Sequence, residues 1–291
     1  MSSRKRNGIK PIVCLLLFVA AAGTDMTAPE NNGETPYLPL FPIFGFGNTI
    51  LKKNELIIGQ GLYNFQFERG RATFLLPALL YGITDSLSLS LYASIASNEQ
   101  EGGCRDISSF GISNTSIVGE YAFFKKKHST TDIEYRATLY CNLGLPVPDQ
   151  KIPPLGYEST TFLLGTAGKI STQSWRVFSF LGALLPTKAN RTEYGKQFFY
   201  EIGCGVSLKH TKTFSAIMLL ECDGRFMQQD TTGPMLDPDS GGSIVLVGPG
   251  IVLRHGRFVF DGAFQAPVFQ SLNGKQEKRL YRFAFQIFWI F

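Results

Sequence analysis

The last twelve residues constrain the fold of this 291-residue chain more than any other stretch. A period of two predicts a β-strand with one apolar face. Three intervening residues, Arg282, Ala284 and Gln286, are small or polar. A strand of this kind suits an outer side in contact with lipid. The apolar and aromatic residues that recur at every second position are Tyr281, Phe283, Phe285, Ile287, Trp289 and Phe291.

These six residues resemble the C-terminal insertion signal of bacterial outer-membrane β-barrels, in which a final Phe and alternating aromatics are read by the insertion machinery. The resemblance implies a location in the outer membrane of a Gram-negative bacterium, with the lipid bilayer and the insertion machinery as partners. A strand of a soluble β-sandwich is the alternative, because it could also bury such a face. The rest of the chain decides whether there are enough strands to close a barrel.

The first 23 residues predict a secretory signal peptide. Basic residues extend to Lys10, an apolar run covers 12–22, and small residues at 20–23 form a cleavage region. An anchored helix is the alternative, but about eleven apolar residues are too few to span a bilayer comfortably. No other apolar run reaches 18 residues. A membrane protein of this sequence would therefore cross as a β-barrel.

Composition agrees with a barrel and argues against several other classes. Aromatic residues are abundant, with 25 Phe and 11 Tyr, and charged residues make up only 18%. The net charge of +5 lies partly in the first ten residues, so we expect no nucleic-acid partner. After the signal peptide, Cys104, Cys141, Cys204 and Cys222 have neither metal-binding nor CxxC spacing. We therefore expect no metal and no cofactor, and leave disulfide pairing open.

From residue 55 onward the chain predicts an all-β fold, a single antiparallel transmembrane β-barrel over residues 55–291. Short connections follow strands two, four, six, eight and ten, and long ones follow strands three, five, seven and nine. This alternation is typical of short periplasmic turns and longer outer loops. The twelve predicted strands cover 55–67, 73–83, 86–97, 111–124, 133–143, 159–170, 175–185, 198–208, 213–227, 243–253, 258–270 and 280–291.

Residues 24–54 are irregular and proline-containing. They predict either a periplasmic lead-in, which we favour, or a partial plug folded into the lumen. Apolar residues on both parities of several strands need a cover, which could be this segment or an apolar solute. Those stretches are 74–76, 162–164, 178–181 and 244–247.

The inward parity carries charges of both signs, so the sequence predicts no single-sign field for steering ions. Charges that brace the barrel wall by pairing are one interpretation, and contact with a solute is the other. The lumen-facing candidates are Glu120, Glu134, Arg136, Tyr140, Lys169, Glu201, Glu221, Asp223, Asp261, Gln265 and Arg282.

A lipid-cleaving enzyme is a further hypothesis, since some outer-membrane barrels use a histidine near the outer leaflet. The predicted topology instead places His128, His210 and His255 in short periplasmic turns, apart from one another. No GxSxG, HExxH or phosphate-binding glycine motif occurs. We therefore expect no catalytic residues.

Several sequence blocks resemble the meta-pathway phenol-degradation transporter family, outer-membrane barrels related to fatty-acid and aromatic-hydrocarbon channels. The most specific is Tyr-Gly-Ile-Thr-Asp-Ser-Leu within 80–89; Ser113-Asn114 departs from an expected Gly-Asp. The resemblance implies transport of small apolar or aromatic molecules. The alternative is a structural or surface-interaction barrel with a plugged lumen, acting through its outer loops. The other blocks lie at 110–114, 120–121, 143–146, 248–251, 265–268 and 272–274.

Overall fold

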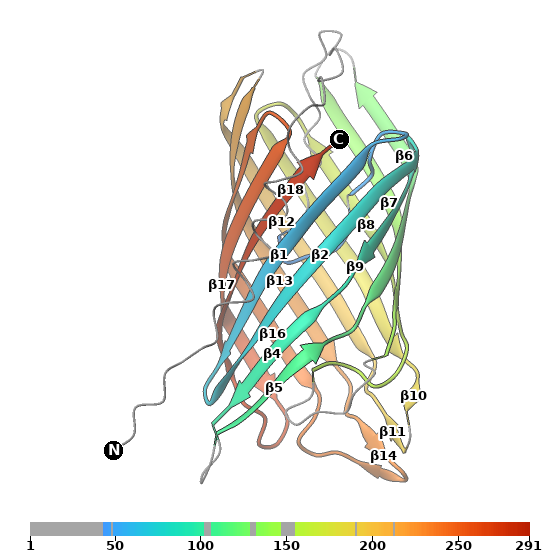
Figure 1. Cartoon of the computed structure of the whole chain (residues 1–291), viewed down its shortest axis with the longest axis vertical. Coiled ribbons are helices and arrows are strands. Elements are labelled where there is room, and N and C mark those ends of the chain that lie inside the picture. The colour runs from blue at the N-terminus through green and yellow to red at the C-terminus, as the bar shows by residue number, and fades with distance from the viewer. Residues whose placement is uncertain are drawn as a thin grey trace, which may run out of the picture. The chain divides into compact units, whose positions relative to one another are not determined.

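The computed structural model describes residues 43–47, 49–101, 106–128, 132–146, 155–189, 191–211 and 213–291. The predicted signal peptide lies outside these residues. Fourteen strands form one antiparallel sheet, which closes because β1 pairs with both β2 and β18. Figure 1 shows the strands of the wall strongly inclined to the long axis of the barrel. The predicted all-β transmembrane barrel is confirmed.

Twelve wall positions account for these fourteen strands, because β3 and β4 both pair with β2, and β5 and β6 continue one another along the next position. The strands are β1 (Leu56–Phe67), β2 (Gly70–Thr84), β3 (Leu87–Tyr92), β4 (Ile95–Gln100), β5 (Ile107–Ile112), β6 (Ser116–His128), β7 (Ile133–Gly144), β8 (Thr161–Ser171), β9 (Trp175–Pro186), β12 (Gln197–His210), β13 (Phe214–Met227), β16 (Gly242–His255), β17 (Phe258–Leu272) and β18 (Arg279–Ile290).

A second sheet of four short strands lies at the end of the barrel opposite the C-terminus (Figure 1). It is built from the long connections that follow β9 and β13, which the sequence predicted as loops. Its position marks the outer end, since the short connections lie at the end where the chain finishes. Its strands are β10 (Lys188–Ala189), β11 (Thr192–Glu193), β14 (Thr231–Thr232) and β15 (Met235–Leu236).

Most predicted strand boundaries are shifted by one to five residues, and three stretches differ more. The stretch 86–97 forms two strands rather than one, and much of the predicted loop 98–110 is strand. The basic stretch 125–128 continues β6 instead of turning. Polar residues at these positions are compatible with a strand because the ladders extend beyond the apolar band into water. Likewise, His128, His210 and His255 are the last residues of β6, β12 and β16 rather than turn residues.

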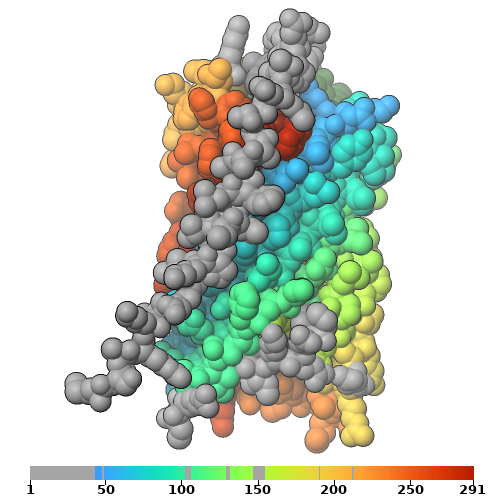
Figure 2. Space-filling model, viewed as in Figure 1, coloured from blue at the N-terminus to red at the C-terminus, as the bar shows by residue number. Residues whose placement is uncertain are grey.

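The outward face of the barrel is apolar, with the period of two that the sequence predicted. Figure 2 shows strands from β1 to β9 following one another across one side of this wall. On β18, Phe285 is 49% exposed while the adjacent Ala284 is 4% exposed. Within the described part of the chain, no helix is long and apolar enough to cross a membrane. Other outward side chains include Leu89, Leu91, Phe162, Leu164, Leu181, Ile202 and Leu220.

One seam in the wall is closed by side chains instead of a backbone ladder. Among the described residues, β5 pairs only with β4, because β7 ends where it meets the start of β6. There the Asn114 amide nitrogen donates to the carbonyls of Leu145 and Tyr157, at 2.8 and 3.0 Å. Its carbonyl oxygen accepts from the Tyr157 backbone N–H at 2.8 Å. Ser113 donates to the Leu155 carbonyl, so the chain after β7 covers the gap.

Candidate functional site

The predicted lumen-facing residues all lie on the inward parity of their strands. Two are partly buried, Glu134 and Asp223. The structure distributes them over three levels of the lumen rather than gathering them into one site. The buried members are Glu120, Arg136, Tyr140, Lys169, Glu201, Glu221, Asp261, Gln265 and Arg282.

At the middle level, three glutamates on three strands hold the backbone of residues 43–47 and 49–51, called the 43–51 segment below, inside the barrel. Each carboxylate accepts a hydrogen bond from a backbone N–H of this segment, and the three donors are spaced three residues apart. The pairs are Ile43 with Glu221 at 2.9 Å, Phe46 with Glu201 at 3.1 Å, and Thr49 with Glu120 at 2.9 Å.

Two further hydrogen bonds attach this segment to β18 and β3. The Gln286 side chain donates to the Ile43 carbonyl at 3.0 Å, and the Leu51 N–H donates to Ser88 Oγ at 2.8 Å. The segment therefore crosses the lumen from one wall to the other. The lead-in favoured from the sequence does not describe residues 43–51, and residues 24–42 lie outside the described part of the chain.

Aromatic packing and small residues fit the segment to the wall. The Phe46 ring lies 5.3 Å from Phe180, 5.4 Å from Phe199 and 5.9 Å from Tyr140, measured between centroids. A Cβ on Gly45 would lie 1.7 Å from a Glu201 carboxylate oxygen. Glycine at this position is what allows the backbone to approach that carboxylate. In the Phe-Gly-Phe-Gly stretch, the phenylalanine rings thus pack against the wall, and the glycines allow the backbone to approach it closely.

At the inner level, two cations lie on neighbouring strands. Arg136 on β7 donates to Glu134 at 2.6 Å, and its register partner on β8 is the buried Lys169. Asp261 on β17 is buried on the far side of the barrel, opposite Gln286 in the register. Arg136 and Lys169 line the half of the lumen nearest the C-terminus, whereas Asp261 lies level with Gln286, which holds Ile43 at the middle level.

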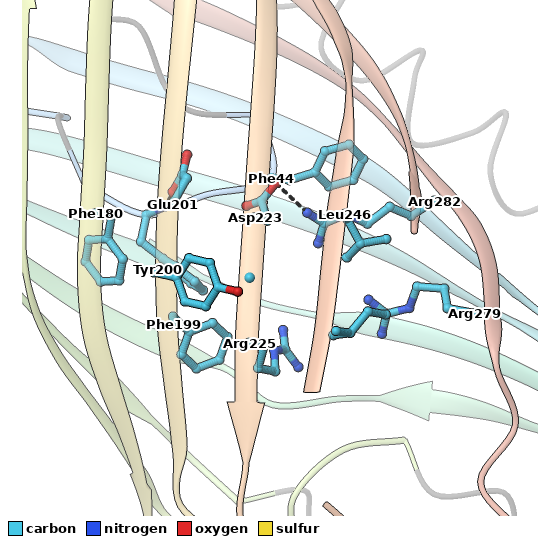
Figure 3. A pocket seen from close by; sticks show the side chains of 13 residues that line it. Phe44, Phe180, Phe199, Tyr200, Glu201, Asp223, Arg225, Leu246, Arg279 and Arg282 are labelled. Atoms are coloured by element: carbon cyan, nitrogen blue, oxygen red, sulfur yellow. Dashed lines mark hydrogen bonds and ion pairs between the residues drawn. The ribbon is translucent and has the colours of Figure 1, made fainter. Parts of the chain in front are cut away.

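At the outer level, Arg282 is held by a charged network that the sequence predicted only as separate residues. It pairs with Asp223 at 2.8 Å, and Nε donates to the Gln265 side-chain oxygen at 2.7 Å. The guanidinium also lies 4.1 Å from the centroid of the Phe44 ring. Figure 3 shows this group beside a small cavity that is bordered on other sides by Arg225 and Arg279.

Arg225 and Arg279 are inward-facing residues that the sequence analysis missed. Arg225 continues the parity of Asp223 near the end of β13 and could have been found by counting one step further. Arg279 has the outward parity of β18, so simple alternation places it in lipid. A register shift opposite Gln66 and Phe67 reverses that parity, because a one-residue slip exchanges the two faces.

A pocket of about 420 Å³ lies in the lumen, mainly in its outer half. This volume lies in the usual range for small-molecule sites. The 43–51 segment forms one side, and polar groups such as Asn114 and Asn142 contribute to the lining. Its aromatic and aliphatic part comes from Tyr63, Phe65, Phe74, Leu76, Tyr92, Val118, Tyr140 and Phe288, and further polar groups come from Thr49, Ser90, Ser94, Ser113, Ser116, Glu120 and Gln286.

Two tyrosines from the outer connections pack together near the mouth of the barrel. The rings of Tyr157 and Tyr194 make an edge-to-face contact at 5.2 Å, and Gln197 on β12 donates to the Tyr157 hydroxyl. Burial raises the pKa of Tyr157, and the nearby Arg225 opposes that rise. The hydroxyl therefore stays protonated at neutral pH and keeps its capacity to donate as well as to accept.

The side chains that could support metal binding or catalysis, namely the cysteines and histidines, do not gather at one place in the described residues. The three described cysteines, Cys141, Cys204 and Cys222, are free thiols. Among the residues that the structure describes, no group of three or more His, Cys, Asp and Glu side chains is arranged to hold a metal ion. The three histidines end three different strands.

No protein-family model matches the chain, and no curated protein sequence matches it. Among solved structures, an outer membrane channel from Pseudomonas putida F1 matches with a TM-score of 0.63 and 12% identity, covering 90% of this chain and 100% of that one. Lower scores are found for LpxR from Salmonella typhimurium (TM-score 0.44, 11% identity, 82% and 100% covered) and for the KdgM porin (0.42, 9%, 79% and 98%).

At these identities the likeness concerns the fold alone. The chain has the closed antiparallel barrel and the apolar outward face of a bacterial outer-membrane protein, which together place it in the bacterial outer membrane.

Proposed function

We propose that this barrel is a channel for the passive passage of small apolar or aromatic molecules across the outer membrane. The observation that carries the proposal is the aromatic-lined pocket of about 420 Å³ in the outer half of the lumen. Pockets that bind small molecules combine aromatic and aliphatic walls with placed polar groups, and this pocket has both. A phenol or a related product of aromatic degradation has the size and polarity for it.

Passage would need no cofactor and no reaction. A solute partitions from the outer mouth into the pocket because its apolar surface leaves water. It then meets residues 43–51, which act as a partial plug. Movement of that segment, or of the solute past it, completes the crossing down the concentration gradient. The six aromatic and apolar residues of the last strand would serve the insertion machinery and not the solute.

A second function is favoured by the same segment. Three carboxylates and an aromatic cluster hold residues 43–51 across the lumen. A barrel that is permanently closed in this way would be a structural or surface-interaction protein that acts through its outer loops. The two functions differ in one measurable property, which is solute flux.

Flux should be measured with the folded, full-length mature protein in liposomes, for a phenol-sized aromatic, a long-chain fatty acid and a sugar. A channel of the proposed kind passes the aromatic or the fatty acid faster than protein-free liposomes and passes little sugar. Equal passage of the sugar would show a general porin. No flux of any solute through protein shown to be folded would establish the closed barrel instead.

A pocket variant and its matched control link the flux to the lumen. Leu76 lines the pocket from β2, so Leu76→Gln introduces an amide there at similar volume. We expect it to reduce aromatic flux severalfold, since burying an amide without partners costs about 1–3 kcal/mol. Leu76→Met keeps the apolar character and the approximate volume, and its flux should stay near that of the wild type.

A further inference from the structure

Arg225 and Arg279 at the outer level have no evident use in the passage of an uncharged solute. They come from β13 and β18 and border the same cavity of about 40 Å³. Within the described residues, no carboxylate lies within ion-pair distance of either guanidinium, in contrast to Arg282, which pairs with Asp223. Two arginines that border a cavity and form no ion pair need another explanation for their presence there.

Both guanidiniums are held against phenylalanine rings. Arg225 lies 4.5 Å from the centroid of Phe199, and Arg279 lies 5.1 Å from that of Phe65. Contact with a ring face fixes the position of a guanidinium. It leaves the in-plane N–H groups, five per arginine, available as donors. Arg279 Nε is a buried donor that lacks a hydrogen-bond acceptor among the described residues.

The acidic groups at this cavity are already engaged. Asp223 accepts from Arg282 and from Gln265, and Glu201 accepts the Phe46 N–H. Because these carboxylates already have donors, they do not neutralise Arg225 and Arg279. Their own negative charge would repel a dianionic ligand, so the two arginines suit a ligand with a single negative charge.

The small cavity adjoins the larger pocket. Phe44 and Phe46 line both, and Phe65, which lies beneath Arg279, lines the larger one. A ligand with its apolar body in the larger pocket can therefore place one end at the arginines. Figure 3 shows Arg225 and Arg279 at the border of the small cavity, with Phe44 and Phe199 close by.

We propose that the outer lumen binds monocarboxylates with an apolar body, and that Arg225 and Arg279 receive the carboxylate while the aromatic pocket takes the body. This deepens the proposed channel function, on which it rests, by naming the class of solute. Charge-assisted hydrogen bonds from arginine to a carboxylate are among the stronger ones in proteins. The two guanidiniums, already held by the rings, lose little freedom when they form them.

The test compares phenylbutyrate, which is ionised at neutral pH, with phenylbutanol, which has the same body and no charge. Binding is measured by equilibrium dialysis with the full-length mature protein in nanodiscs. The variant is Arg225→Gln with Arg279→Gln, and the control is Arg71→Gln, an arginine at the outer rim that pairs with Glu99 at 2.9 Å. Heat-modifiable mobility on a gel shows that each variant is folded.

We expect the wild type to bind the carboxylate about tenfold more tightly than the alcohol. The double variant should bind both with the affinity of the alcohol, and the Arg71 control should keep the preference. High salt should weaken the preference in the wild type, because salt screens charges that water can reach. This last measurement needs no variant and so does not depend on the double variant folding.

Equal binding of the two probes by the wild type would overturn the inference, as would a preference that survives in the double variant or in high salt. The channel itself is judged separately, from phenylbutanol flux in liposomes. Flux without a carboxylate preference would leave the channel standing and reject the anion site. A carboxylate preference without any flux would leave the anion site standing and reject the channel.

Discussion

Replacing Gly45 with alanine tests whether residues 43–51 are held in the lumen by their fit against Glu201. The new Cβ would lie 1.7 Å from one oxygen of that carboxylate and 2.0 Å from its carbon. The oxygen concerned also accepts the Phe46 N–H at 3.1 Å. Since the carboxylate must move to admit the methyl group, we expect this hydrogen bond to be lost.

The size of the effect follows from that one bond. Leaving a buried donor or acceptor unsatisfied costs about 1–3 kcal/mol, so the loss of this bond should cost about 2 kcal/mol and shift the docking equilibrium of the segment roughly 30-fold. The bonds to Glu120 and Glu221 remain, so the segment should be loosened without being released.

Amide hydrogen exchange of a peptide covering residues 43–51 measures this shift directly, because exchange reports local opening. In nanodiscs, Gly45→Ala should increase the exchange rate of these amides about 30-fold. Gly119→Ala is the matched control, since a Cβ there would meet nothing within 4 Å. Its exchange profile should match that of the wild type.

A double-mutant cycle with Glu201→Ala identifies the cause. Both single changes break the same hydrogen bond, so the double variant should exchange about as fast as Glu201→Ala alone, which is a coupling of about 2 kcal/mol. Additive effects would show that Gly45 acts through some other contact. Unchanged exchange in Gly45→Ala would refute the argument altogether.

Three further predictions follow from the wall and the last strand. Asn114→Ala removes the hydrogen bonds that tie Tyr157 and its neighbours over the seam, so we expect faster protease cleavage of the 145–160 connection and increased apolar flux. Leu164→Arg places a charge on an outward side chain that is 48% exposed, and should lower the free energy of unfolding in lipid vesicles by about 2–4 kcal/mol if the site lies near the bilayer midplane. Phe291→Ser should reduce the heat-modifiable, folded fraction in outer membranes without a comparable change in the stability of protein refolded in detergent.

The wall of the barrel could be predicted from the sequence because each strand reports its two faces locally. On β18 the alternation between Phe285 and Gln286 is enough to assign lipid and lumen. The breaks in β3–β4 and β5–β6 were not predictable in this way. At the seam, a backbone ladder is replaced by the side chain of Asn114, and its partners lie 31 and 43 residues further along the chain.

The lumen could be predicted only in part. Strand parity was enough to place Glu201 and Glu221 inward. It could not indicate what they bind, because their partners in the 43–51 segment are 155 and 178 residues away in the sequence. The available signal was the Phe-Gly-Phe-Gly pattern together with inward apolar residues that needed a cover. Arg279 was beyond reach, since its inward orientation depends on a register shift that no local pattern reports.

The three glutamates also determine what an open lumen must contain. A buried carboxylate without partners costs several kcal/mol, and an unsatisfied backbone N–H costs about 1–3 kcal/mol. When residues 43–51 leave their position, both sets of groups therefore require water at the middle level. The pocket also touches the Glu120 carboxylate, but its aromatic side can hold an apolar solute away from that group. The solute would thus leave an aromatic wall for a hydrated passage, and we expect this step, and not binding, to limit the rate of crossing.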